Sequence, residues 1–229
     1  MRSGLTLVLI VGLVPFVLGV GGGGGGGGSS GPSAEELALQ NAIASREAGF
    51  GCQNQSSMAE RILCRLGFPV TGQLDYQPEE CRAKVLQGKL DCYDFYESVQ
   101  PCWLNETDGE RLACARTAIG FSASIPTERA RCETLNTANK VLCKQKLRAN
   151  VDKLVKFRLY QLSQKALYFH QEGAPQNQIV AFIQYIEETK QSYSAAGTKQ
   201  AKIDLIRQVQ TKWREFVEQI KDSLPEETE

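Results

Sequence analysis

The chain of 229 residues is long enough for one large domain or two small ones, and its 26 Lys and Arg balance its 26 Asp and Glu. This balance leaves no overall charge that would attract nucleic acid, so we expect no nucleic-acid partner. The single histidine, His170, cannot supply a histidine metal cage, and we expect neither a metal site nor a cofactor.

Residues 1–20 are typical of a targeting segment. Arg2 precedes an apolar run, residues 5–20, that is shorter than the roughly 20 residues needed to span a bilayer. The run fits the apolar region of a signal peptide; the alternative is an uncleaved N-terminal anchor, the one route by which we expect membrane contact. Residues 21–33 are rich in Gly and Ser and predict a flexible linker. We therefore expect a chain that is secreted or tethered to the outer surface of the cell membrane.

Residues 34–146 contain a duplicated cysteine pattern, preceded by a helix expected over residues 34–48. The spacing is C-x11-C-x16-C-x10-C over residues 52–92 and C-x11-C-x17-C-x10-C over residues 102–143. Each unit has Glu-Arg ahead of its second cysteine and a capping box, the Ser/Thr-x-x-Glu pattern that begins a helix. The capping boxes are Ser57-Met-Ala-Glu60 and Thr107-Asp-Gly-Glu110. These matches predict two copies of one helical unit.

All eight cysteines are expected to form disulfides. Zinc sites and thiol redox sites use closely spaced pairs such as Cys-x-x-Cys, and the sequence has none. The third and fourth cysteines of each unit are eleven residues apart, which places both on one side of a single helix. Each unit then folds as a helical hairpin, and among the many pairings that eight cysteines allow we predict a nested one. The predicted pairs are Cys52–Cys92, Cys64–Cys81, Cys102–Cys143 and Cys114–Cys132.

Two glycosylation sequons lie just ahead of the two capped helices. They begin at Asn54 and Asn105, and a secreted chain would present such sites for N-glycosylation. The alternative is that the Ser and Thr of these sequons serve helix capping, so that both sequons are by-products of the duplication.

An aromatic cluster joins the two units and is the first candidate binding patch. It includes Tyr93, Phe95 and Trp103, and exposed aromatic side chains commonly anchor protein interfaces. The alternative interpretation is that these rings form the core between the two hairpins.

A basic stretch, residues 140–158, is the second candidate. It contains Lys140, Lys144 and Arg148 and only one acidic residue, Asp152. Such a stretch would bind an anionic glycan, acidic lipid headgroups or a negatively charged protein. The alternative is a solvated helix face without a partner.

The sequence of the C-terminal half predicts a helical bundle. Residues 127–172 contain neither Gly nor Pro and predict one long helix, whose second half begins a cysteine-free region, residues 147–229. Apolar residues recur at helical spacing over residues 176–195 and 198–223, and short connections predict antiparallel neighbours. The sequence therefore predicts an all-α protein in which two tandem disulfide-stapled hairpins are joined by a long helix to a C-terminal three-helix antiparallel bundle.

No catalytic motif is recognisable, so we expect no catalytic residues. The sequence favours a secreted or cell-surface, non-catalytic interaction or structural module that binds an extracellular protein, an anionic glycan or a headgroup. One alternative is a secreted hydrolase using a carboxylate pair such as Asp91 and Asp94, or Glu187 and Glu188. The other is a carrier of an apolar ligand or lipid, bound in a cavity lined by the aromatic cluster.

Overall fold

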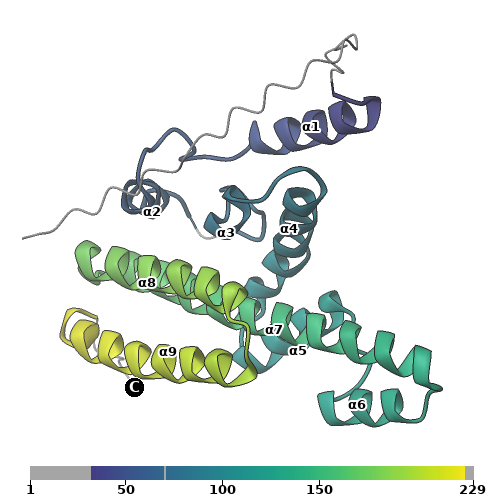
Figure 1. Ribbon diagram of the computed structural model, residues 1–229. Coiled ribbons are helices and arrows are strands. Elements are labelled where there is room, and N and C mark those ends of the chain that lie inside the picture. Colours follow the sequence, from purple (N-terminus) through teal and green to yellow (C-terminus); the bar gives the residue numbers. More distant parts are fainter. Residues whose placement is uncertain (1–31, 70, 225–229) are drawn as a thin grey trace, which may run out of the picture. The chain divides into compact units, whose positions relative to one another are not determined.

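The structure is a computed structural model that describes residues 32–69 and 71–224. These residues are mostly α-helical, with no β-strand beyond an isolated bridge between Gly51 and Tyr76, which confirms the all-α class (Figure 1). From Ala34 onward they form one compact unit. The expected signal peptide or anchor, residues 1–20, and all but the end of the expected linker, residues 21–33, lie outside the described residues.

From α3 onward the helices follow one another through short connections, whereas longer segments join α1 to α2 and α2 to α3. Their bounds are α1 (Ala34–Glu47), α2 (Met58–Leu66), α3 (Glu79–Arg82), α4 (Leu86–Val99), the 3-10 helix η1 (Gln100–Leu104), α5 (Asp108–Ile119), α6 (Ile125–Glu133), α7 (Thr137–Gln171), α8 (Gln176–Ala195), α9 (Lys199–Ile220) and the 3-10 helix η2 (Lys221–Ser223). The expected C-terminal bundle is formed by α7, α8 and α9: α8 packs against both of the others and runs antiparallel to α9 (Figure 1). Gly173, with a φ of 105°, follows the end of α7, as a helix-terminating glycine should.

Both predicted capping boxes are present. The Ser57 hydroxyl accepts from the Glu60 amide at 3.2 Å, and Thr107 accepts from the Glu110 amide at the same distance. The arginines that follow also have matching roles, because the Arg61 side chain donates to the Gln55 carbonyl at 3.0 Å and Arg111 donates to the Asn105 carbonyl at 2.8 Å. The repeated Glu-Arg pair therefore fastens each capped helix to the loop before it.

The nested disulfide pairing is wrong, because within each unit the first cysteine pairs with the second and the third pairs with the fourth. The third and fourth cysteines of each unit do not share one helix: α3 ends at Arg82 and α4 begins at Leu86, so a turn separates them. This turn brings the Cα atoms of Cys81 and Cys92 to 5.6 Å, whereas eleven residues along one helix would separate them by about 16 Å. The observed pairs are Cys52–Cys64, Cys81–Cys92, Cys102–Cys114 and Cys132–Cys143.

The corresponding turn of the second unit interrupts the long helix predicted over residues 127–172. The structure has α6 up to Glu133 and α7 from Thr137, and the side chain of Asn136 caps α7 by accepting from the Asn139 amide at 3.1 Å. A good N-cap residue thus begins a new helix although neither Gly nor Pro is present. We call α6, the turn and the first half of α7, up to residue 153, the α6–α7 hairpin; Cys132–Cys143 closes it.

Two buried clusters hold the described part together. The larger joins α7, α8 and α9 and includes Ile62 of α2, so the first cysteine unit contributes to the core of the bundle. The smaller is aromatic and joins α4 to α7 through Tyr93, Tyr96, Phe157 and Tyr160. Burial of this apolar area stabilises the folded chain by about 25 cal/mol per Å². The four disulfides add to this stability by restricting the unfolded chain in the N-terminal half, where most helices are short.

The disulfide pairing gives a direct prediction. A non-reducing digest of the chain folded in an oxidising host should yield four linked peptide pairs, each joining cysteines 11 or 12 residues apart. Trypsin opens every loop, and a Glu-specific protease cuts at Glu97 between Cys92 and Cys102. A reduced aliquot should release every peptide singly. A linked pair containing Cys52 and Cys92 would restore the nested arrangement.

Candidate functional site

The aromatic candidate patch lies in the core rather than on the surface. Tyr93 is fully buried and Phe95 is 8 % exposed. The Tyr93 hydroxyl donates to Glu47 at 2.6 Å, and although burial acts against the charged form, hydrogen bonds from Tyr93 and Lys89 lower the pKa of Glu47. Trp103 is partly exposed, but the Arg111 guanidinium covers its ring at 4.2 Å from the centroid. The burial of Tyr93 and Phe95 therefore agrees with the core interpretation of the aromatic cluster.

Part of the basic stretch is also used inside the fold. Lys140 and Lys144 lie 3.7 Å and 2.7 Å from the Glu133 carboxylate, and the hydrogen bond from Lys144 holds the pKa of Glu133 below its ordinary value. Lys156 pairs with the buried carboxylate of Glu80, which also accepts from Tyr96. Each of these lysines therefore has an internal carboxylate partner.

The remaining cations of the stretch face solvent. Lys146, Arg148 and Lys153 are exposed, and no carboxylate lies within ion-pair distance of them in the described residues. The single acid of the stretch is engaged elsewhere, because Asp152 accepts from Lys202 and from the Tyr193 hydroxyl, both at 2.9 Å. Lys146, Arg148 and Lys153 thus lie along one segment of α7 without an ion-pair partner among the described residues. Arg158, which is also exposed, follows them and donates to the Gln161 side chain at 2.9 Å.

Exposed apolar side chains lie beside these cations. Leu135 in the turn is 38 % exposed, and Val141 and Leu142 in α7 are 50 % and 63 % exposed. The buried residues of α7 begin only at Phe157. Figure 1 shows the N-terminal end of α7, with α6 alongside it, extending beyond α8 and α9. We call the group of Leu135, Val141, Leu142, Lys146, Arg148 and Lys153 the hairpin surface.

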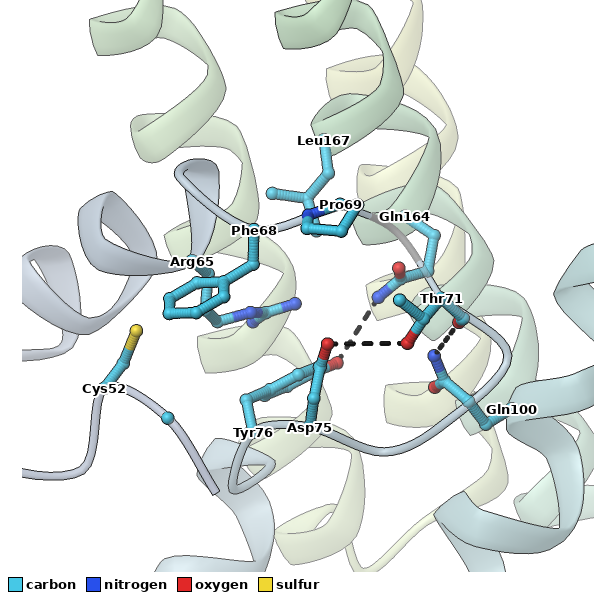
Figure 2. Close-up of a pocket in the computed structure, with 11 residues that line it drawn as sticks. Cys52, Arg65, Phe68, Pro69, Thr71, Asp75, Tyr76, Gln100, Gln164 and Leu167 are labelled. Carbon is cyan, nitrogen blue, oxygen red and sulfur yellow. Dashed lines mark hydrogen bonds between the residues drawn. The ribbon is translucent and has the colours of Figure 1, made fainter. Parts of the chain in front are cut away.

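A small cavity is lined by Arg65, Thr71, Asp75, Tyr76 and Gln164, among others (Figure 2). Arg65 is 7 % exposed, its guanidinium lies 3.4 Å from the centroid of the Tyr76 ring, and its Nη2 has no hydrogen-bond partner among the described residues. Gln164 donates to the Tyr76 hydroxyl at 3.3 Å, and the Thr71 hydroxyl donates to Asp75 at 3.4 Å.

The size of this cavity limits what it can hold. Its volume is about 20 Å³, which admits one water molecule and no organic ligand. A water there would find polar partners in Arg65, Asp75 and Gln164, which all line the cavity (Figure 2). The cavity is therefore too small to be a ligand site.

A scan against protein-family models finds no match to this chain, and neither do searches of curated proteins and of solved structures. The assignment of a function therefore rests on the residues themselves. Within the described ranges, no three His, Cys, Asp or Glu side chains gather as a metal site would require. No helix in those ranges has both the length and the apolar character needed to cross a membrane.

The carboxylates considered for hydrolysis have separate structural partners. Asp94 forms an ion pair with Arg46 at 2.7 Å, and Asp91 accepts from a glutamine one turn away. Glu187 is buried against Lys190, whereas its neighbour Glu188 is exposed. Neither pair forms a two-carboxylate cleft.

The carrier alternative required a cavity lined by the aromatic cluster. The open grooves at the end of α1 and between α8 and α9 are lined by residues outside the predicted aromatic cluster.

The two sequons differ in their surroundings. Asn54 is exposed in a turn, whereas the amide of Asn105 is partly buried and donates to the Cys102 carbonyl at 3.0 Å. Thr107, the third residue of the second sequon, is the N-cap of α5, but Ser56 of the first lies one residue before the N-cap Ser57. Ser56 nevertheless donates to the capping-box carboxylate of Glu60 at 2.6 Å, so a hydroxyl of each sequon takes part in capping, and glycosylation at either site stays a prediction.

Proposed function

We propose that this chain is an extracellular, non-catalytic helical module that binds an anionic partner through the hairpin surface. Four disulfides among the described residues are typical of proteins that fold in an oxidising compartment. The observation that carries the proposal is the group of exposed, uncompensated cations at Lys146, Arg148 and Lys153, on a hairpin whose outer part buries almost nothing.

The charge of the hairpin supports an anionic partner. Residues 125–153 contain seven Lys and Arg but three Asp and Glu, a local net charge of +4, whereas the whole chain is neutral. The rest of the chain therefore carries −4. Although the whole chain is neutral, the positive charge of residues 125–153 attracts an anionic partner and steers it toward the hairpin.

The hairpin is also preorganised for binding. Cys132–Cys143 joins α6 to α7 across the turn, with a Cα separation of 5.5 Å. Asn136 caps α7 at the same turn. A partner that binds here orders little additional backbone, so less of the interaction free energy is lost to conformational entropy.

The proposal is tested with immobilised heparin, a sulfated polyanion, at low ionic strength. Replacing Lys146→Glu together with Arg148→Glu should weaken retention by about tenfold or more, since two attractive charge contacts become repulsive. The matched control is Arg207→Glu with Arg214→Glu on α9, both exposed, which changes the net charge equally. Equal losses in both variants would show that only total charge matters and would refute a binding role for the hairpin.

A further inference from the structure

We infer that the anionic partner is the surface of a phospholipid bilayer, and that Leu135, Val141 and Leu142 enter it while the cations behind them bind lipid headgroups. The inference rests on the proposed function and adds to it the apolar half of the hairpin surface. A sulfated glycan or a free phosphate would engage the cations alone and would leave these three apolar side chains in water.

The order of residues along α7 matches the layering of a bilayer. At about 100° per residue, Arg148 lies within about 20° of Val141, and Lys146 and Lys153 lie within about 40° of Leu142. At about 1.5 Å per residue, these cations lie roughly 6–16 Å behind the apolar pair. Leu135 lies in the turn at the end of the hairpin, Val141 and Leu142 lie about one helical turn behind it, and the cations follow on the same face. A bilayer approached end-on presents its acyl boundary and its headgroups in this order.

The cationic side chains can adapt to this depth. Lysine and arginine carry apolar stems that lie along hydrocarbon while the charged group reaches the headgroups. Among the described residues, no acid forms an ion pair with these cations: Asp152 accepts from Lys202 and Tyr193, and Glu133 pairs with Lys140 and Lys144. A basic surface with apolar residues at its end is the pattern that binds anionic lipids peripherally.

The exposed apolar residues distinguish the bilayer from a protein partner. Leu135 and Val141 lie on a projecting hairpin, with the turn at its end, rather than in a groove. A protein would need a recess shaped for this end and ringed by acids, whereas a fluid bilayer accepts a convex apolar end of any shape. The bilayer therefore requires fewer complementary features of the partner.

The test uses co-sedimentation of the full chain with vesicles of phosphatidylcholine alone, or of two parts phosphatidylcholine to one part phosphatidylserine. The original chain should bind the mixed vesicles at least about tenfold more tightly than the neutral ones. Val141→Ser with Leu142→Ser should lose about tenfold or more of this binding. All variants share residues 1–33, so differences between them report on the hairpin and not on the N-terminal segment.

The control for the apolar change is Val85→Ser with Leu104→Ser, which removes one Val and one Leu that are 76 % and 64 % exposed elsewhere. It should bind mixed vesicles as the original chain does. If the Val141/Leu142 variant also binds unchanged while Lys146→Glu with Arg148→Glu loses heparin, the bilayer inference is overturned and the proposed function stands. If the charge variant keeps both heparin and vesicle binding, both proposals fail.

Discussion

Replacing Lys190 by methionine is expected to lower the free energy of unfolding by about 3–5 kcal/mol, because it leaves a buried carboxylate without its counter-charge. The side chains of Lys190 and Glu187 are 1 % and 2 % exposed, and they form an ion pair at 2.8 Å within α8. Lys190 also lies 5.4 Å and 5.8 Å from the ring centroids of Tyr96 and Tyr160. Its loss therefore removes two cation–π contacts as well.

Two further variants separate burial from charge. Lys190→Met combined with Glu187→Leu should recover most of the lost stability, since removing both charges leaves no unpaired group in the core. Lys212→Met breaks a pair with the same i,i+3 spacing, but its side chains are 46 % and 52 % exposed, and it should cost less than about 1 kcal/mol. Urea unfolding followed by far-UV circular dichroism measures all three. Equal losses for Lys190→Met and Lys212→Met would contradict a destabilising buried charge.

The sequence contained a signal for this pair that the helical pattern alone could not interpret. Ile183, Ile186 and Tyr193 form the apolar stripe of α8, and all three are buried as expected. Lys190 falls on the same stripe, four residues after Ile186 and three before Tyr193. A charged residue in such a position is either buried with a partner or marks a break in the stripe. Only the surrounding helices decide which, because the partner carboxylate must also lose its water.

The elements that were predicted correctly depend on local chemistry. Capping boxes, the stop at Gly173 and the apolar spacing of α8 and α9 involve residues a few positions apart, so one sequence suffices to read them. The disulfide pairing and the continuity of residues 127–172 depend instead on whether a turn is inserted at one place. Asn136 was the available signal, but Asn also occurs within helices, and the closing contact across Cys132–Cys143 was needed to show the turn.

The candidate site residues likewise fall into those whose surroundings follow from local sequence and those that depend on the fold. Exposure of Arg148 follows from its charge, whereas the burial of Tyr93 and the pairing of Lys156 with Glu80 depend on contacts between residues far apart in the chain. The exposure of Val141 and Leu142 could not be predicted from a single helix over residues 127–172, because it depends on which helices pack against that part of α7. The hairpin leaves that face uncovered in the described structure.

Replacing Phe216 by alanine is expected to lower the free energy of unfolding by about 3–5 kcal/mol, because it opens a cavity where α9 meets α8. Phe216 is 2 % exposed and stacks on Phe182 with ring centroids 4.3 Å apart. Trp213 lies against both rings, at 5.6 Å and 5.4 Å. The control is Tyr168→Ala, which removes an aromatic ring that is 49 % exposed and should change stability by less than about 0.5 kcal/mol.

The course of unfolding should also change in the Phe216 variant. In the described part of the chain, α9 buries only Val209, Phe216 and Ile220, and no disulfide reaches it. The cysteine units are held by four crosslinks, so loss of one aromatic anchor should release α9 before the stapled helices unfold. In a Trp103→Phe background, where Trp213 is the one remaining tryptophan, its fluorescence should therefore change at a lower urea concentration than the far-UV circular dichroism signal. Coincident transitions in the Phe216 variant would mean instead that α9 and the stapled helices form one cooperative unit.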